Sequence, residues 1–120
     1  MGILIVALLA AATVAHAGST IPSRVTIRFD DSRKVERLEG KVYSPSAQCR
    51  RNRLVILFRV EGDTTMRVGE DRTNVRAYWF AEPEPGRTEV PPGTYYARIK
   101  LKKTGEGRCA ANRSRSIEII

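Results

Sequence analysis

The chain has 120 residues, a net charge of +8 and one histidine, His16. This length suits a single domain with a modest core, and the positive charge favours polyanionic partners or serves to keep an exported protein in solution. If His16 is removed with a signal peptide, no imidazole remains, which excludes Ser-His-Asp and Cys-His catalysis and the usual zinc sites.

The first segment is typical of a secretory signal peptide. Residues 3–12 are apolar and uncharged, and Ala15 and Ala17 form the pattern that signal peptidase recognises. The apolar stretch is shorter than the about 20 residues that a membrane-spanning helix needs. No basic residue precedes it, so an upstream start codon or an uncleaved anchor is the alternative. We therefore predict a signal peptide at 1–17 and a single secreted domain at 18–120.

Alternating side chains predict strands in the first half of this domain. Residues 24–29 alternate between apolar and polar side chains, as in a half-buried strand. An acidic turn at 30–32 separates this strand from a second one at 38–43. The strongest apolar run, 54–60, is rich in β-branched and aromatic residues and predicts the central strand.

Two short strands and two breaks follow. Strands are expected at 65–68 and 75–80, with a turn at 69–71 between them. After an acidic loop rich in proline, Pro91-Pro92-Gly93 has the order of a type II turn, in which glycine takes the positive φ. We expect a strand to begin directly after this turn.

The clearest two-faced strand lies near the C-terminus. Two sets of side chains alternate along it: Tyr95, Ala97, Ile99 and Leu101, and between them Tyr96, Arg98, Lys100 and Lys102. We expect the first set to face the core and the second to face solvent. A last strand is expected at 116–120, and no helical periodicity is present after residue 17. Seven short strands over about 100 residues predict an all-β, seven-stranded sandwich of two sheets.

Two cysteines, Cys49 and Cys109, complete the domain. An even number of cysteines in an exported chain favours one disulfide over a metal site or reactive thiols. Cys49 precedes the predicted central strand and Cys109 precedes the last one, so the bond would join loops at one end of the sandwich. Closing a loop of this length stabilises a fold by roughly 4 kcal/mol in the chain-entropy model.

Several segments together resemble a known family. Gly40-Lys41-Val42, the run 53–60, the segment 69–74 and the turn and strand 92–97 are similar to carboxypeptidase-regulatory-like and transthyretin-like modules. In those modules a PGxY turn leads the penultimate strand and a TDxxGxF segment opens the strand before it; here Ala77 stands where the glycine would be. The resemblance implies an Ig-like or prealbumin-like sandwich.

The cysteine positions resemble a narrower group. One cysteine before the central strand and one in a G-x-G-x-C turn, 105–109, are similar to small exported actinobacterial domains without an assigned activity. The likeness rests on turns and strands, so it implies a fold and a binding or structural role.

Paired carboxylates are the remaining candidates for acid and base chemistry. They are Asp30 with Asp31, Glu70 with Asp71, and Glu82 with Glu84. All lie in predicted turns, where acidic residues are usually solvated caps, and a small sandwich offers little room for a glycosidase cleft. Calcium at the first pair would need about six or more oxygen ligands, and no EF-hand loop is present. We expect no catalytic residues, no metal and no cofactor, and keep a carboxylate-dependent hydrolase as the remote alternative.

Basic and aromatic side chains give the candidate binding residues. The predicted polyanion-binding residues are Arg24 and Arg28 on one strand and Arg98, Lys100 and Lys102 on another. Tyr78 and Tyr96 are the candidates for stacking on sugars, because Trp79 should lie in the core with Ala77. The alternative is an ordinary solvated face whose lysines discourage aggregation between strand edges.

These observations favour a non-catalytic exported module with a structural or binding role at the cell surface or in the medium. The alternative is a binder of an anionic or carbohydrate polymer of the cell envelope, and a surface protein is another candidate partner. Export argues against nucleic acid as the partner.

Overall fold

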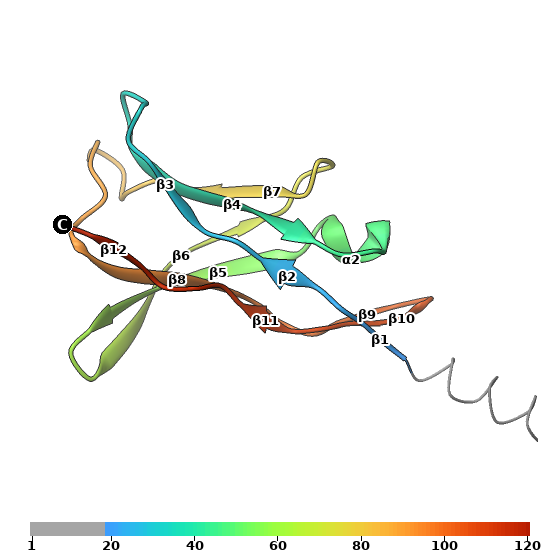
Figure 1. Ribbon diagram of the computed structural model, residues 1–120. Coiled ribbons are helices and arrows are strands. Elements are labelled where there is room, and N and C mark those ends of the chain that lie inside the picture. The colour runs from blue at the N-terminus through green and yellow to red at the C-terminus, as the bar shows by residue number, and fades with distance from the viewer. Residues whose placement is uncertain (1–18) are drawn as a thin grey trace, which may run out of the picture.

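The computed structural model describes residues 19–120, which form an all-β domain with one short helix (Figure 1). The predicted signal peptide, residues 1–17, lies outside these residues. The elements in chain order are β1 (Thr20–Ile21), β2 (Arg24–Val25), β3 (Arg28–Asp30), β4 (Arg37–Tyr43), α2 (Ala47–Arg50), β5 (Leu54–Glu61), β6 (Thr64–Arg72), β7 (Tyr78–Ala81), β8 (Gly93–Ile99), β9 (Lys102–Thr104), β10 (Gly107–Cys109), β11 (Asn112–Arg113) and β12 (Ile117–Ile119). Within 19–120, a search for helices long and apolar enough to span a membrane finds none.

Two larger antiparallel sheets make up most of the domain. In the first sheet β4 is central, with β2 and β3 on one side and β7 on the other. In the second sheet β8 and β5 are central; β11 and β12 pair with β8, and β6 is the edge strand beside β5. The sheets lie one above the other in Figure 1, and their inner faces enclose the core.

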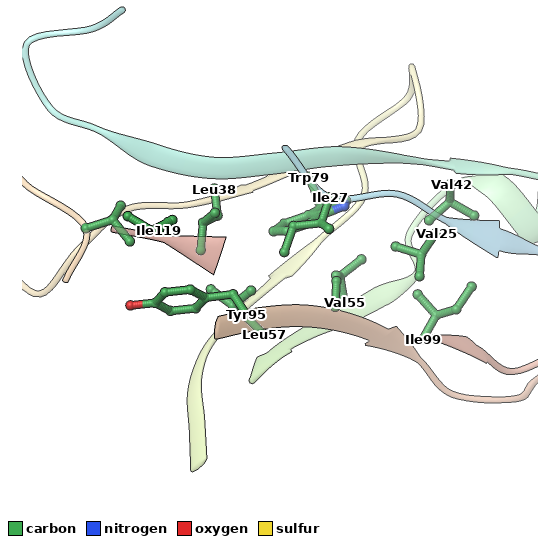
Figure 2. Close-up of a cluster of buried hydrophobic side chains, with 12 residues drawn as sticks. Val25, Ile27, Leu38, Val42, Val55, Leu57, Trp79, Tyr95, Ile99 and Ile119 are labelled. Atoms are coloured by element: carbon green, nitrogen blue, oxygen red, sulfur yellow. The ribbon is translucent and has the colours of Figure 1, made fainter. Parts of the chain in front are cut away.

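The core contains the apolar side chains that the alternation predicted (Figure 2). The first sheet contributes Val25, Leu38, Val42 and Trp79, and the second contributes Val55, Leu57, Tyr95, Ala97, Ile99 and Ile119. Ile27, from the segment between β2 and β3, and Val90, from the loop before β8, complete the cluster. Trp79 and Ala77 are each 2% exposed, which confirms the prediction that both are buried. Because the side chains of a strand alternate between its faces, the residues between these core positions point outward from the two sheets.

The predicted disulfide is confirmed. Cys49 in α2 is bonded to Cys109 at the end of β10. β10 belongs to a small third sheet, in which it lies between β1 and β9. The bond therefore joins the helical turn before the central strand β5 to the hairpin that follows β8, at one end of the domain.

The prediction of seven strands is wrong, since the described residues contain twelve strand segments. β1, β9 and β10 form the third sheet, the strand predicted at 24–29 is broken into β2 and β3, and a second break separates the last strand, β12, from the unpredicted segment β11. At the first break, between β2 and β3, the Thr26 hydroxyl accepts a hydrogen bond from the Lys41 amide (3.0 Å), while the Thr26 carbonyl accepts one from the Trp79 indole (3.1 Å). A side chain thus replaces a backbone group in the ladder.

The second break has the same cause. Between β11 and β12 the Ser114 hydroxyl accepts a hydrogen bond from the Ala97 amide, and the Ser114 amide donates to the Ala97 carbonyl, both at 2.8 Å. The strand predicted at 116–120 is β12, and the unpredicted segment β11 pairs with the same strand, β8, on the other side of the break at Ser114.

Three other predicted boundaries are also wrong. β6 runs through the turn predicted at 69–71, because Gly69, Glu70 and Asp71 pair with β5 and a register shift leaves Val68 without a cross-strand partner. Pairing with β5 therefore overrides the local turn preference of these residues.

β7 begins at Tyr78 instead of residue 75. The Asn74 side chain accepts hydrogen bonds from the amides of Arg76 and Tyr78, and Ala77 has a φ of +67°, so the segment before β7 is a turn. β8 ends at Ile99, so Leu101, predicted to face the core, is 48% exposed.

Candidate ligand-binding surfaces

The outer face of the first sheet carries exposed aromatic rings and basic side chains. We call this surface the aromatic-cationic face; its residues are Arg24, Arg28, Arg37, Lys41, Tyr43, Tyr78 and Phe80. Their strand neighbours Val25, Val42 and Trp79 are buried in the core, so these residues point away from it. The residues Tyr43, Tyr78 and Phe80 are 44%, 49% and 45% exposed.

The cations on this face lie over the rings. The Arg24 guanidinium is 4.7 Å from the centre of the Tyr43 ring, and the Lys41 Nζ is 5.2 Å from Tyr43 and 5.3 Å from Tyr78. The strand register produces these contacts, because Arg24 is paired with Tyr43 and Lys41 with Tyr78 across β4. Cation-π contacts hold the long basic side chains in place before any ligand binds.

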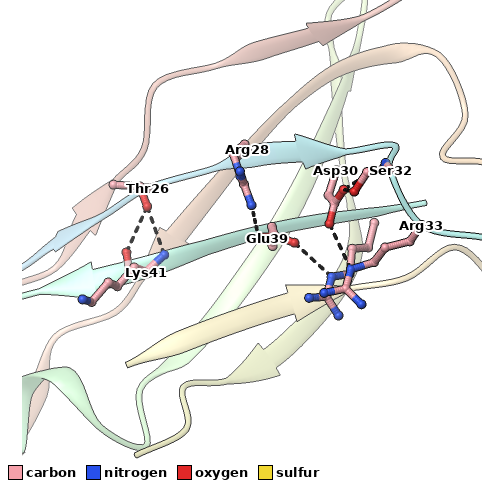
Figure 3. Close-up of polar contacts among 8 residues, drawn as sticks. Thr26, Arg28, Asp30, Ser32, Arg33, Glu39 and Lys41 are labelled. Carbon is pink, nitrogen blue, oxygen red and sulfur yellow. Dashed lines mark hydrogen bonds and ion pairs between the residues drawn. The ribbon is translucent and has the colours of Figure 1, made fainter. Parts of the chain in front are cut away.

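The other end of the face contains the carboxylate of Glu39. Glu39 forms ion pairs with Arg28 and with Arg37, the second at 3.0 Å (Figure 3). The hydrogen bond and the charge of Glu39 raise the pKa of Arg28. The guanidinium of Arg37 also lies 4.5 Å from the centre of the Phe80 ring. Arg24 and Lys41, by contrast, form no ion pair within residues 19–120, and they are the cations of this face with uncompensated charge.

The second sheet carries a groove with a different composition. We call it the cationic groove; it has a volume of about 430 Å³ and is lined by Arg98, Ile99, Lys100, Leu101, Ala111, Asn112 and Arg113. No acidic residue lines it, and none of its three cations forms an ion pair in the described part of the chain. Arg98 and Arg113 are register partners on β8 and β11, so the pairing of these strands brings the charges together.

Tyr96 and Lys102, two of the predicted site residues, do not belong to an exposed surface. Tyr96 was predicted to be exposed but is only 9% exposed, because its ring stacks on Phe58 at 5.2 Å and Arg113 covers it at 3.7 Å.

Lys102 does not share a face with Arg98, because β8 ends at Ile99 and Lys102 begins β9. Its Nζ donates to the carbonyls of Gln48 (3.0 Å) and Arg51 (3.1 Å). Burial, and then the nearby charges of Arg53, Arg72 and Arg51, lower the pKa of Lys102. Lys102 thus holds the α2 segment in place.

Asp30, Asp71 and Glu70, three of the paired carboxylates, are engaged in local contacts. Asp30 accepts hydrogen bonds from the Ser32 amide (3.0 Å), the Ser32 hydroxyl (2.6 Å) and the Arg33 Nε (2.9 Å), which together lower the pKa of Asp30. Asp71 accepts a hydrogen bond from the Phe80 amide, and Glu70 pairs with Arg67.

Glu82 and Glu84 line a mostly apolar recess of about 340 Å³ between β6 and the loop 82–91, where Glu84 lies 4.0 Å from Arg87. Among residues 19–120 no group of three or more potential metal ligands is gathered in one place.

Comparison of the chain with protein-family models, with characterised proteins and with solved structures found no match.

The structure brings some of the predicted site residues together and separates others. Arg24, Arg28 and Tyr78 meet on the aromatic-cationic face, and Arg98 and Lys100 meet in the groove. Five further residues of the two surfaces were not among the predicted site residues: Arg37, Lys41, Tyr43, Phe80 and Arg113. Alternation along 37–43 places Lys41 and Tyr43 on the same face as Glu39, and that signal could have identified both.

Proposed function

We propose that this chain is an exported, non-catalytic binding module whose aromatic-cationic face binds an anionic glycan of the cell envelope. The observation that carries the proposal is the interleaving of uncompensated cations and exposed aromatic residues on one sheet face: Arg24 and Lys41 with Tyr43 and Tyr78. An anionic glycan offers the two complementary features, charged groups for the cations and sugar rings for the aromatic side chains.

Charge and exposure support this ligand class. The net charge of +8 lies entirely outside the predicted signal peptide, because residues 1–17 contain no Asp, Glu, Lys or Arg. Cations whose rotamers are already restricted lose less entropy when a ligand binds. Rings that are almost half exposed can pack against the ligand without moving from the sheet.

We also propose that the two sheets form an Ig-like or prealbumin-like sandwich related to carboxypeptidase-regulatory-like modules. The order of strands supports this, with β2 and β3, β4 and β7 in one sheet and β11 and β12, β8, β5 and β6 in the other. The Tyr95 hydroxyl donates to the Pro91 carbonyl (2.6 Å) at the start of β8, as in the tyrosine corner of Ig-like domains. Cross-strand contacts measured by NMR that pair the strands in a different order would contradict this assignment.

The functional proposal is tested with an immobilised sulfated glycan, heparin, and with neutral dextran as the comparison. The secreted protein should bind heparin at low salt, and affinity should fall steeply as salt increases. The double variant Arg24→Gln/Lys41→Gln should bind roughly tenfold more weakly. The matched control Lys34→Gln/Lys103→Gln removes the same charge from exposed positions outside this face and should change affinity much less.

Tyr78→Ala separates the contribution of the rings from that of charge. It keeps the net charge, so we expect heparin affinity to fall a few-fold with the same salt dependence. Equal losses for the face variant and the control would show that binding follows net charge alone, and the proposed site would then be wrong.

A further inference from the structure

We infer that the cationic groove is a second binding site for anionic glycan, so that one copy of this protein joins two polymer chains. This inference rests on the proposed function of the aromatic-cationic face and adds a role for the opposite side of the molecule.

The groove gathers three cations without a compensating acid. Arg98, Lys100 and Arg113 are exposed, and within residues 19–120 none of them forms an ion pair. Keeping like charges together is unfavourable unless an anion neutralises them, and here the backbone pairing of β8 with β11 fixes Arg98 beside Arg113. The arrangement is complementary to a chain of closely spaced anionic groups.

Aromatic side chains fix the direction of two of these cations. The guanidinium of Arg113 lies 3.7 Å from the centre of the Tyr96 ring, and that of Arg98 lies 5.4 Å from Phe58. Tyr96 and Phe58 stack on each other, so both arginines rest on one aromatic pair and are oriented before a ligand arrives. Since these rings are covered, the groove offers charge but little aromatic surface.

The two sites face in opposite directions. Arg98 alternates with the core residues Ala97 and Ile99 on the second sheet, whereas Lys41 is followed by the core residue Val42 on the first. Face-to-face sheets lie about 10 Å apart, with their outer side chains pointing away from each other. A stiff polymer bound across one outer face therefore does not reach the other face, and two occupied sites require two segments of polymer.

Joining two chains is a distinct property from binding one. A module with one site coats a polymer, whereas a module with two opposed sites cross-links it and gains avidity in a dense network such as an envelope. We therefore assign the protein the role of a bridge between anionic glycan chains.

The test is a two-step capture experiment with heparin as the probe. Secreted protein is captured on surface-bound heparin, the unbound protein is washed away, and fluorescently labelled heparin is then added. The wild-type protein should recruit labelled chains.

The groove variant Arg98→Gln/Lys100→Gln/Arg113→Gln should still be captured, within a few-fold of wild type, and should lose most of the recruitment. The control Lys34→Gln/Lys103→Gln/Arg108→Gln removes the same charge from exposed positions outside both surfaces and should recruit as wild type does.

The outcomes separate the two proposals. Recruitment by the groove variant at the wild-type level would overturn the bridging role while leaving the aromatic-cationic face as a site. Capture that depends on the groove, with no effect of Arg24→Gln/Lys41→Gln, would overturn the proposed function of the face. Thermal unfolding of each variant at the wild-type temperature shows that a loss of recruitment is not a loss of folding.

Discussion

The indole of Trp79 donates a hydrogen bond of 3.1 Å to the carbonyl of Thr26 across the backbone of Gly40. Gly40 is the register partner of Trp79 on β4, and a Cβ at Gly40 would lie 1.9 Å from the Thr26 carbonyl oxygen and 2.6 Å from the indole nitrogen. This contact lies at the break between β2 and β3, which separates Arg24 from Arg28 on the aromatic-cationic face.

Gly40→Ala should therefore lower the free energy of unfolding by about 3 kcal/mol, because the methyl group displaces either the carbonyl or the indole. Gly105→Ala is the matched control, since a Cβ there would meet no atom within 4 Å. Urea unfolding of the two variants measures the difference. If Gly40→Ala lowered the free energy of unfolding no more than Gly105→Ala, the first sheet would be able to accommodate the methyl group without loss of stability, which would contradict the prediction.

Arg53 should be the most sensitive charged position of the fold. It is 2% exposed, and it donates to the Ser23 hydroxyl and to the carbonyls of Cys49, Lys100 and Ala110. Burial of the guanidinium lowers the pKa of Arg53. Arg53→Met should cost about 3–5 kcal/mol of unfolding free energy, because it leaves several buried acceptors without donors.

Arg51→Met, two residues away and exposed, serves as the control for Arg53 and should change stability by less than about 0.5 kcal/mol. Denaturant unfolding monitored by Trp79 fluorescence measures the free energy of unfolding of both variants. Equal stabilities of the two variants would contradict the role of Arg53 as the residue that connects α2, β8 and β10.

The disulfide should contribute a large part of the stability. Cys49 and Cys109 are separated by 60 positions in the chain, and in the chain-entropy model a loop of that length gives about 4 kcal/mol. Cys49→Ser/Cys109→Ser should lose this amount in chemical unfolding at neutral pH. Dithiothreitol should destabilise the wild type to the same extent and leave the double variant unchanged; a wild type that is insensitive to the reductant would contradict the prediction.

Asp30 should make the free energy of unfolding depend on pH in the acidic range. The hydrogen bonds from Ser32, followed by that from Arg33, lower the pKa of Asp30 in the folded state below its usual value near 3.9. The stabilisation is therefore fully present above about pH 4 and is lost as pH falls further, because the unfolded state binds the proton more readily.

Asp30→Asn should flatten the fall of unfolding free energy below pH 4, whereas Asp31→Asn should not. Asp31 is exposed and takes part in no side-chain hydrogen bond among residues 19–120, which makes it the matched control. If the unfolding free energies of wild type and Asp30→Asn fell equally below pH 4, the turn at 30–33 would not contribute to the pH dependence of stability.

Two kinds of feature could be predicted from the sequence. One depends on the alternation of apolar and polar side chains along a strand, and the other on the even number of cysteines in a chain with a predicted signal peptide. The two-residue period identified the core positions of β2, β3, β5 and β8, and the even number of cysteines identified the disulfide. Trp79 was placed in the core for the same reason, because it lies between two outward-facing aromatic residues on one strand.

Features that arise from contacts between distant segments could not be predicted in this way. The strand breaks at Thr26 and Ser114 require a hydroxyl to meet a specific amide on a neighbouring strand. Tyr96 is covered because β5 and β11 bring Phe58 and Arg113 against it.

The aromatic-cationic face itself is a product of register. Lys41 meets Tyr78 only because β4 pairs with β7 at that position, although the two residues lie far apart in the chain. Local patterns indicated basic and aromatic residues, but the pairing of strands determined which of them share a surface.

The central claim is that an anionic glycan binds the aromatic-cationic face, and an NMR titration of the purified protein with a short heparin oligosaccharide tests it most directly. The account predicts that backbone and side-chain signals of Lys41, Tyr43 and Tyr78 shift with increasing ligand, saturate, and return when salt is added. Signals of these residues that stay unchanged while the oligosaccharide saturates the protein elsewhere would contradict the account.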